Sequence, residues 1–112
     1  MTHKESAMGE ILILTTTGSM ELAEKIARSL VEEGNAACVN ILPGIRSLYR
    51  WEGRICDDQE FLMLIKTGAD RYKEVQECIH RLHNYNTPEV IALHITAGDP
   101  DYLNWLREQI RN

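Results

Sequence analysis

Residues 36–67 read AACVNILPGIRSLYRWEGRICDDQEFLMLIKT, and this stretch decides the fold. Two β-patterned runs flank Glu52-Gly53, where a glycine supplies the positive φ that a tight hairpin needs. Pro43-Gly44 interrupts the first run, which indicates a bulge or bend within one long strand. The sequence therefore predicts a long antiparallel hairpin in which Trp51 pairs with Arg54.

The predicted hairpin is longer than a domain of this size is wide. At about 3.3 Å per residue each arm would exceed ~40 Å, with Tyr49 opposite Cys56 near the tip. A protruding two-stranded tip has free strand edges, and pairing with other copies in a closed ring would remove them. The hairpin therefore indicates self-association.

The segment before the hairpin predicts one strand and one helix. Residues 11–17 (ILILTTT) are apolar and β-branched, which is typical of a strand. Apolar positions then recur at helical spacing from Leu22 to Val31. Ser19 is a suitable N-cap for this helix, and Gly34 stands where a C-terminal cap belongs.

The segment after the hairpin predicts a helix, a strand and a last helix. We expect Asp70 to cap the first of these helices, residues 90–95 to form the strand, and Pro100 to begin the last helix. The order is the ferredoxin-like βαββαβ pattern of the α+β class, extended by a C-terminal helix. We expect residues 1–9 to be a flexible N-terminal tail and residues 10–112 to form a single domain.

The first and third strands are apolar on both faces. Ile11 and Ile13 point one way, whereas Leu12 and Leu14 point the other. Two helices cover only one face, and each large apolar side chain left in water forfeits about 1.5–3 kcal/mol. The uncovered face is therefore expected to meet another copy of the chain.

Composition excludes several classes of partner. Against 17 Asp and Glu there are 12 Lys and Arg, a formal net charge of −5, so neither nucleic acid nor an anionic membrane is an expected partner. No apolar run approaches the roughly 18 residues of a membrane span.

Three cysteines without paired spacing indicate free thiols in the cytoplasm. Because no phosphate loop, nucleophile elbow or Cys-x-x-Cys motif occurs, the sequence favours a protein that is not an enzyme.

Distinctive blocks are spread in order from about Ile11 to Ile110. They are AACVNI (36–41), PG (43–44), SLY (47–49), WEG (51–53), Glu60, IKT (65–67), YNTPE (85–89) and DYL (101–103) with Trp105. Together they resemble the CutA family of divalent-cation tolerance proteins. The resemblance implies a tight homotrimer with interlocked hairpins, like that of the PII signalling proteins, and a role in metal tolerance with copper binding.

The resemblance also implies a copper site formed by a cysteine at the end of the first strand and two adjacent histidines. These positions fall on Thr15 and on Leu82-His83, so that only His83 is retained. A hydroxyl is a poor substitute for the soft thiolate that selects Cu(I). His83 is either a weak metal ligand or a complement to its helix dipole. Cys38 is either a soft ligand in an intersubunit cleft or a small buried apolar residue. We expect no required cofactor.

Five further residues are candidates for an intersubunit cleft. They are Trp51, Glu60, Lys66, Tyr85 and Glu89. The three charged members interrupt β-forming segments and therefore need partners. Either they surround a cleft that takes a small anionic or metal-bound ligand, or they form intersubunit ion pairs and hydrogen bonds that fix the trimer.

The sequence thus leaves three functional hypotheses. The first is a homotrimeric divalent-cation tolerance protein that binds copper or another divalent metal weakly. The alternative is a PII-like signalling trimer that senses a small metabolite or nucleotide in intersubunit clefts. The third is a small trimeric enzyme whose sites are assembled at subunit boundaries.

Overall fold

The computed structural model describes residues 9–110, which form one four-stranded antiparallel sheet with three α-helices. The strand order is β2-β3-β1-β4. This is the predicted α+β, ferredoxin-like arrangement with an added C-terminal helix. The elements are β1 (Glu10–Thr17), α2 (Met20–Glu32), β2 (Cys38–Trp51), β3 (Arg54–Gly68), the 3-10 turn η1 (Ala69–Arg71), α3 (Tyr72–Leu82), β4 (Ile91–His94) and α4 (Pro100–Glu108). Of the predicted tail, residues 1–8 lie outside the described residues.

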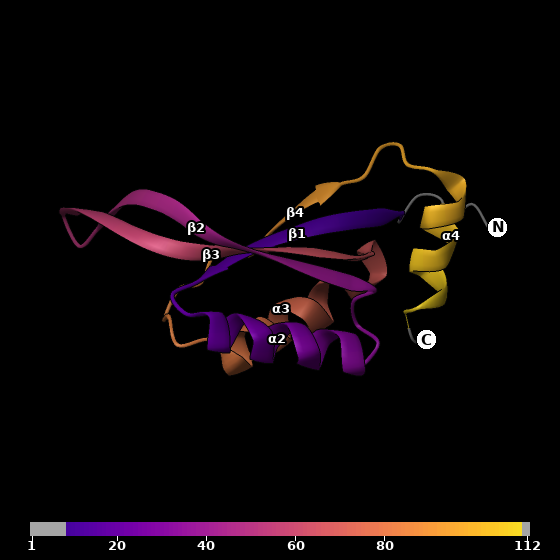
Figure 1. Ribbon diagram of the computed structural model, residues 1–112, viewed down its shortest axis with the longest axis horizontal. Coiled ribbons are helices and arrows are strands. Elements are labelled where there is room, and N and C mark those ends of the chain that lie inside the picture. Colours follow the sequence, from indigo (N-terminus) through magenta and orange to yellow (C-terminus); the bar gives the residue numbers. More distant parts are fainter. Residues whose placement is uncertain (1–8, 111–112) are drawn as a thin grey trace.

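The β2–β3 hairpin extends far beyond the rest of the sheet (Figure 1). Its register pairs Trp51 with Arg54 and Tyr49 with Cys56, which confirms the predicted turn. Glu52-Gly53 carries φ values of 50° and 78°, as a two-residue turn that matches strand twist requires. The register shifts between Leu42 and Ile45, so Pro43-Gly44 is a bulge within one continuous strand.

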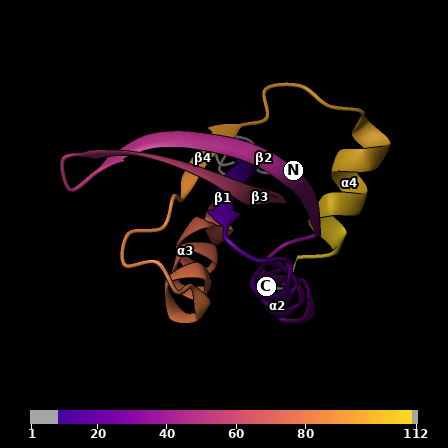
Figure 2. The ribbon, with the colours of Figure 1, turned by 60° about the vertical axis from the view of Figure 1, so that its left-hand side comes forward.

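The helices α2 and α3 cover one face of the sheet, while α4 stands at the end away from the hairpin tip (Figures 1 and 2). Ile13 and Ile65 from the sheet and Ile26 and Ile79 from the two helices are fully buried in the core between these layers. The predicted cap of α2 is confirmed, because the Ser19 hydroxyl accepts a hydrogen bond from the Leu22 amide at 3.1 Å.

The prediction that Asp70 caps the second helix is wrong. Asp70 lies in η1, and α3 begins at Tyr72 without a side-chain cap. Its carboxylate instead pairs with Arg107 of α4 at 3.3 Å, and Arg107 also lies 3.9 Å from a Glu10 carboxylate oxygen. Asp70 therefore helps to hold α4 against the sheet.

The second face of the sheet is apolar and largely uncovered. In-register partners share a face, so Leu12, Leu14, Leu62 and Leu64 lie on it with the edge-strand residues. The edge-strand members Leu42, Ile91 and Leu93 are between 41% and 50% exposed. We call this surface the open face and define it by these seven residues. The described helices include none long and apolar enough to cross a membrane.

Candidate functional site

A cavity of about 620 Å³ lies where the protruding hairpin leaves the sheet. Its lining comes from the end of β1, both hairpin strands and the loop after α3, and its volume is within the range of small-molecule sites. We call it the hairpin cavity. Its lining residues are Thr16, Arg46, Ser47, Leu48, Tyr49, Trp51, Glu60, Tyr85, Asn86, Thr87 and Glu89.

A carboxylate and a phenol face each other in this cavity. Glu60 is only 7% exposed, and its Oε2 accepts a hydrogen bond from the Tyr85 hydroxyl at 2.7 Å. Burial, together with this bond and the carboxylate charge, raises the pKa of Tyr85 to about 12. Tyr85 therefore remains a proton donor to Glu60 at neutral pH.

His83 holds the loop that carries Tyr85. Its Nε2 lies 2.7 Å from the Thr16 carbonyl oxygen, and its Nδ1 accepts the Tyr85 amide at 3.0 Å. A carbonyl only accepts hydrogen bonds, so Nε2 carries the ring proton and the Nδ1 lone pair is already used. The imidazole also packs on the Tyr85 ring, with centroids 4.5 Å apart. In this arrangement neither ring nitrogen is free for a metal ion.

Two polar pairs fix the hairpin strands that wall the cavity. The Arg46 guanidinium donates two hydrogen bonds to Asp57, at 2.9 and 2.6 Å, which raises the pKa of Arg46 and lowers that of Asp57. The Tyr49 hydroxyl donates to Asp58, and this bond raises the pKa of Tyr49 above its ordinary value. Arg46 is the only lysine or arginine in the lining, and Asp57 neutralises its charge. Glu60 and Glu89 therefore have no basic partner among the lining residues.

The structure brings together four of the five predicted cleft residues. Trp51, Glu60, Tyr85 and Glu89 all line the hairpin cavity. Lys66 does not, because it lies in the inner half of β3, with its Nζ 5.9 Å from the centroid of the Tyr102 ring.

Several lining residues are not predicted from the sequence, among them Thr16, Arg46 and Asn86. Asn86 lies in the same sequence block as Tyr85, so the block itself was a usable signal for the loop. Thr16 and Arg46 carried no such signal.

The predicted metal ligands His83 and Cys38 are not neighbours. Cys38 pairs in register with Lys66, which pairs with Leu12, whereas His83 contacts Thr16 four residues further along β1. That offset is about 13 Å along the strand direction. Cys38 is half-buried, with Sγ 3.8 Å from Asn40 Oδ1.

Thr15, at the position of the family's cysteine, is fully buried on the helix side of the sheet. Its Oγ1 has no hydrogen-bond partner in the structure. Residues 9–110 contain no cluster of three or more His, Cys, Asp or Glu that could hold a metal ion. A resident metal centre therefore does not fit the donors of one described subunit.

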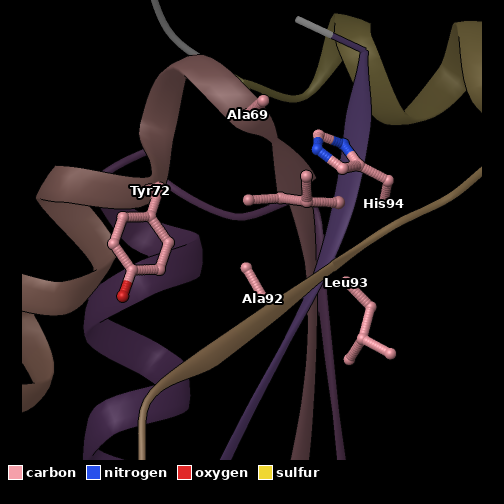
Figure 3. A pocket seen from close by; sticks show the side chains of 6 residues that line it. Ala69, Tyr72, Ala92, Leu93 and His94 are labelled. Carbon is pink, nitrogen blue, oxygen red and sulfur yellow. The ribbon is translucent and has the colours of Figure 1, made fainter.

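A second cavity, of about 160 Å³, lies between β4 and η1 (Figure 3). It is lined by Ala69, Tyr72, Ala92, Leu93 and His94 together with Ile11. This volume is below the range of ordinary ligand sites. The hairpin cavity is therefore the stronger candidate.

The fold and the cavity define the class of protein: a ferredoxin-like α+β subunit with a protruding hairpin and an uncovered apolar sheet face. Residues 11–109 match the family described as CutA1 divalent ion tolerance protein. The chain belongs to this family, which confirms the resemblance found in the sequence blocks.

Individual relatives agree with this assignment. The divalent-cation tolerance protein CutA of Thermus thermophilus is 48% identical over 99 residues, covering 88% of this chain and 96% of the relative. The crystal structure of CutA1 from Oryza sativa has a TM-score of 0.90 at 40% identity, covering 93% of this chain and 95% of that one. A structure from Archaeoglobus fulgidus, described as a periplasmic divalent cation tolerance protein CutA, has a TM-score of 0.88 at 39% identity, with 91% and 99% covered.

Proposed function

We propose that this chain contributes to divalent-cation tolerance as a homotrimer and catalyses no reaction. The family match supports the tolerance part of the proposal. The open face supports the assembly, because Leu42, Ile91 and Leu93 are about half exposed on a sheet whose other face is already covered. Burying each such side chain contributes about 1.5–3 kcal/mol when burial is complete. Association of copies through this face supplies that burial.

The hairpin supports a closed ring of copies. Residues 45–59 form a two-stranded ribbon, and an isolated hairpin of this kind is marginally stable in water. Leu48 and Ile55 of this ribbon are exposed in the subunit. Contacts with neighbouring copies would cover these side chains and pair the free strand edges.

We propose that metal binding is weak and transient rather than structural. To bind a metal, His83 must give up its bond to the Thr16 carbonyl or to the Tyr85 amide. Losing one hydrogen bond costs about 0.5–1.5 kcal/mol. Cys38 offers a soft donor at a separate position of the subunit, and copper is the divalent ion that such nitrogen and sulfur donors bind most firmly.

A copper titration followed by calorimetry tests the metal proposal. We expect weak, saturable binding by the wild-type protein that is reduced in His83→Ala and in Cys38→Ser. The matched control is His80→Ala, on the exposed side of α3. Unchanged binding in both variants, or the same loss in the control, would refute the assignment of these two ligands.

The alternative is a PII-like sensor that binds a small molecule in the hairpin cavity. The observation that favours it is the cavity's size and its convergent polar groups, Glu60 and Tyr85. A calorimetric screen with metabolites in the absence of metal distinguishes the two functions. A saturating metabolite without any metal response would favour the sensor, and a metal response alone would favour tolerance by binding.

We further propose a cytoplasmic location. Cys38, Cys56 and Cys78 are all free thiols, which suits a reducing compartment. Cell fractionation tests this proposal, and recovery from the periplasm, as described for the Archaeoglobus fulgidus relative, would contradict it.

A further inference from the structure

Glu60 is a buried carboxylate that lacks a cation. It is 7% exposed and accepts a hydrogen bond from Tyr85, but it takes part in none of the ion pairs formed within residues 9–110. A buried charge is costly unless it is paired. Glu60 therefore lacks the positive partner that its burial calls for.

The surroundings of Glu60 add to the negative charge. Glu89 lines the same cavity and also forms no ion pair within the described chain. Arg46, the one basic residue in the lining, is bound by both oxygens of Asp57. The field inside the hairpin cavity consequently favours cations over anions.

Aromatic rings complete the lining. Trp51, Tyr49 and Tyr85 all line the cavity and are partly exposed. Aromatic faces attract organic cations and also bury the apolar body that such cations carry. A bare divalent metal ion would instead need at least three donors around one point, and the described residues form no such cluster.

We propose that the hairpin cavity binds a small organic cation, an amine or guanidine with an apolar body. Its charged nitrogen pairs with Glu60, and its apolar part lies against Trp51 and the tyrosines. This inference rests on the second proposed function, ligand sensing in the cavity, and names the class of ligand. It replaces the anionic ligand considered from the sequence, because the lining is acidic.

Trp51 provides the signal for a direct test. In a Trp105→Phe background Trp51 is the only tryptophan in the chain, so its fluorescence reports on the cavity. The probes are phenethylamine and agmatine, with 2-phenylethanol as the neutral comparison. We expect both cations to change the fluorescence saturably and the alcohol to leave it unchanged.

Two variants test whether the negative charge of Glu60 is what binds the cation. Glu60→Gln preserves the shape of the side chain but removes its charge, and we expect it to weaken cation binding by about tenfold or more. Glu24→Gln removes the same charge from the exposed side of α2 and should bind like the wild type. Equal binding by Glu60→Gln, or no saturable binding of either cation up to about 10 mM, would overturn the proposal.

Sedimentation of the same samples distinguishes a failure of the organic-cation proposal from a failure of the trimer proposal. An intact trimer that binds no cation overturns the ligand class and leaves the assembly standing. If Glu60→Gln dissociates the oligomer and no cation binds, the partner of Glu60 is a lysine or arginine of an adjacent copy, and the organic-cation proposal fails. A monomer that binds cations would instead refute the trimer alone.

Discussion

The inner and outer halves of the β2–β3 hairpin share one hydrogen-bond ladder but differ in what covers them. In the inner half, Met63 and Ile65 are fully buried under α2 and α3. In the outer half, Leu48 and Ile55 are more than 60% exposed. Backbone pairing therefore continues beyond the region where side chains are packed by the helices. This difference indicates that the outer half makes its side-chain contacts with another molecule rather than with its own subunit.

The largest expected effect is in the inner half. Ile65→Ala removes a fully buried side chain and should lower the free energy of unfolding by about 2–5 kcal/mol. Ile55→Ala, the matched change in the outer half, should lower the free energy of unfolding by less, because this side chain is 65% exposed in the subunit. Urea denaturation at one fixed protein concentration measures the difference. Equal losses in the two variants would contradict the distinction between the halves.

A charge on the open face should break the assembly without unfolding the subunit. Leu93→Glu places a carboxylate on the half-exposed edge strand β4, where a partner's apolar surface would have to desolvate it. We expect sedimentation to give the mass of one chain and circular dichroism to show a folded protein. Glu24→Gln on α2 serves as the control, and an undiminished oligomer of Leu93→Glu would argue against an interface on this face.

A smaller effect is expected in the hairpin cavity at high pH. The pKa of Tyr85 is raised to about 12, so the folded protein holds this proton more tightly than the unfolded chain, in which tyrosine titrates near 10. The resulting stabilisation is complete below pH ~10 and is lost as the pH rises toward 12. Ultraviolet titration of Glu60→Gln should reveal a tyrosine that ionises at lower pH than in the wild type. An unchanged titration curve would show that Glu60 does not act on Tyr85.

The smallest effect is expected for the outer ion pair. Arg46 and Asp57 are both exposed, so water and salt screen their attraction even though the geometry is bidentate. The lowered pKa of Asp57 contributes stability above the usual carboxylate range, and this contribution disappears as the pH falls through the folded pKa. Asp57→Asn should barely move the urea midpoint at neutral pH. A large shift would mean that the outer hairpin holds the subunit together.

The hairpin was predictable because its determinants are local. Glu52-Gly53 sets the turn and thereby the pairing of Trp51 with Arg54. Strands with apolar residues on both faces likewise predicted the open face. Four of the five cleft residues line the hairpin cavity although Glu60 and Tyr85 are 25 residues apart, because the sheet and the loop after α3 bring them together.

What the sequence does not reveal depends on contacts between residues that are distant in sequence. Asp70 carries the signal of a helix cap, but Arg107, 37 residues away, engages it instead. The imidazole of His83 is hydrogen-bonded to the backbone carbonyl of Thr16. Every residue has a backbone carbonyl, so residue types alone could not predict this bond. Lys66 stays a prediction for an intersubunit cleft, because its register position, opposite Cys38, lies in the inner half of the ladder and outside the hairpin cavity of one subunit.

Sedimentation equilibrium of the full chain at dilute concentration tests the central claim most directly. Three copies joined through their uncovered apolar sheet faces should give the mass of three chains, and that mass should persist on dilution. A stable, folded protein with the mass of one chain would contradict the account.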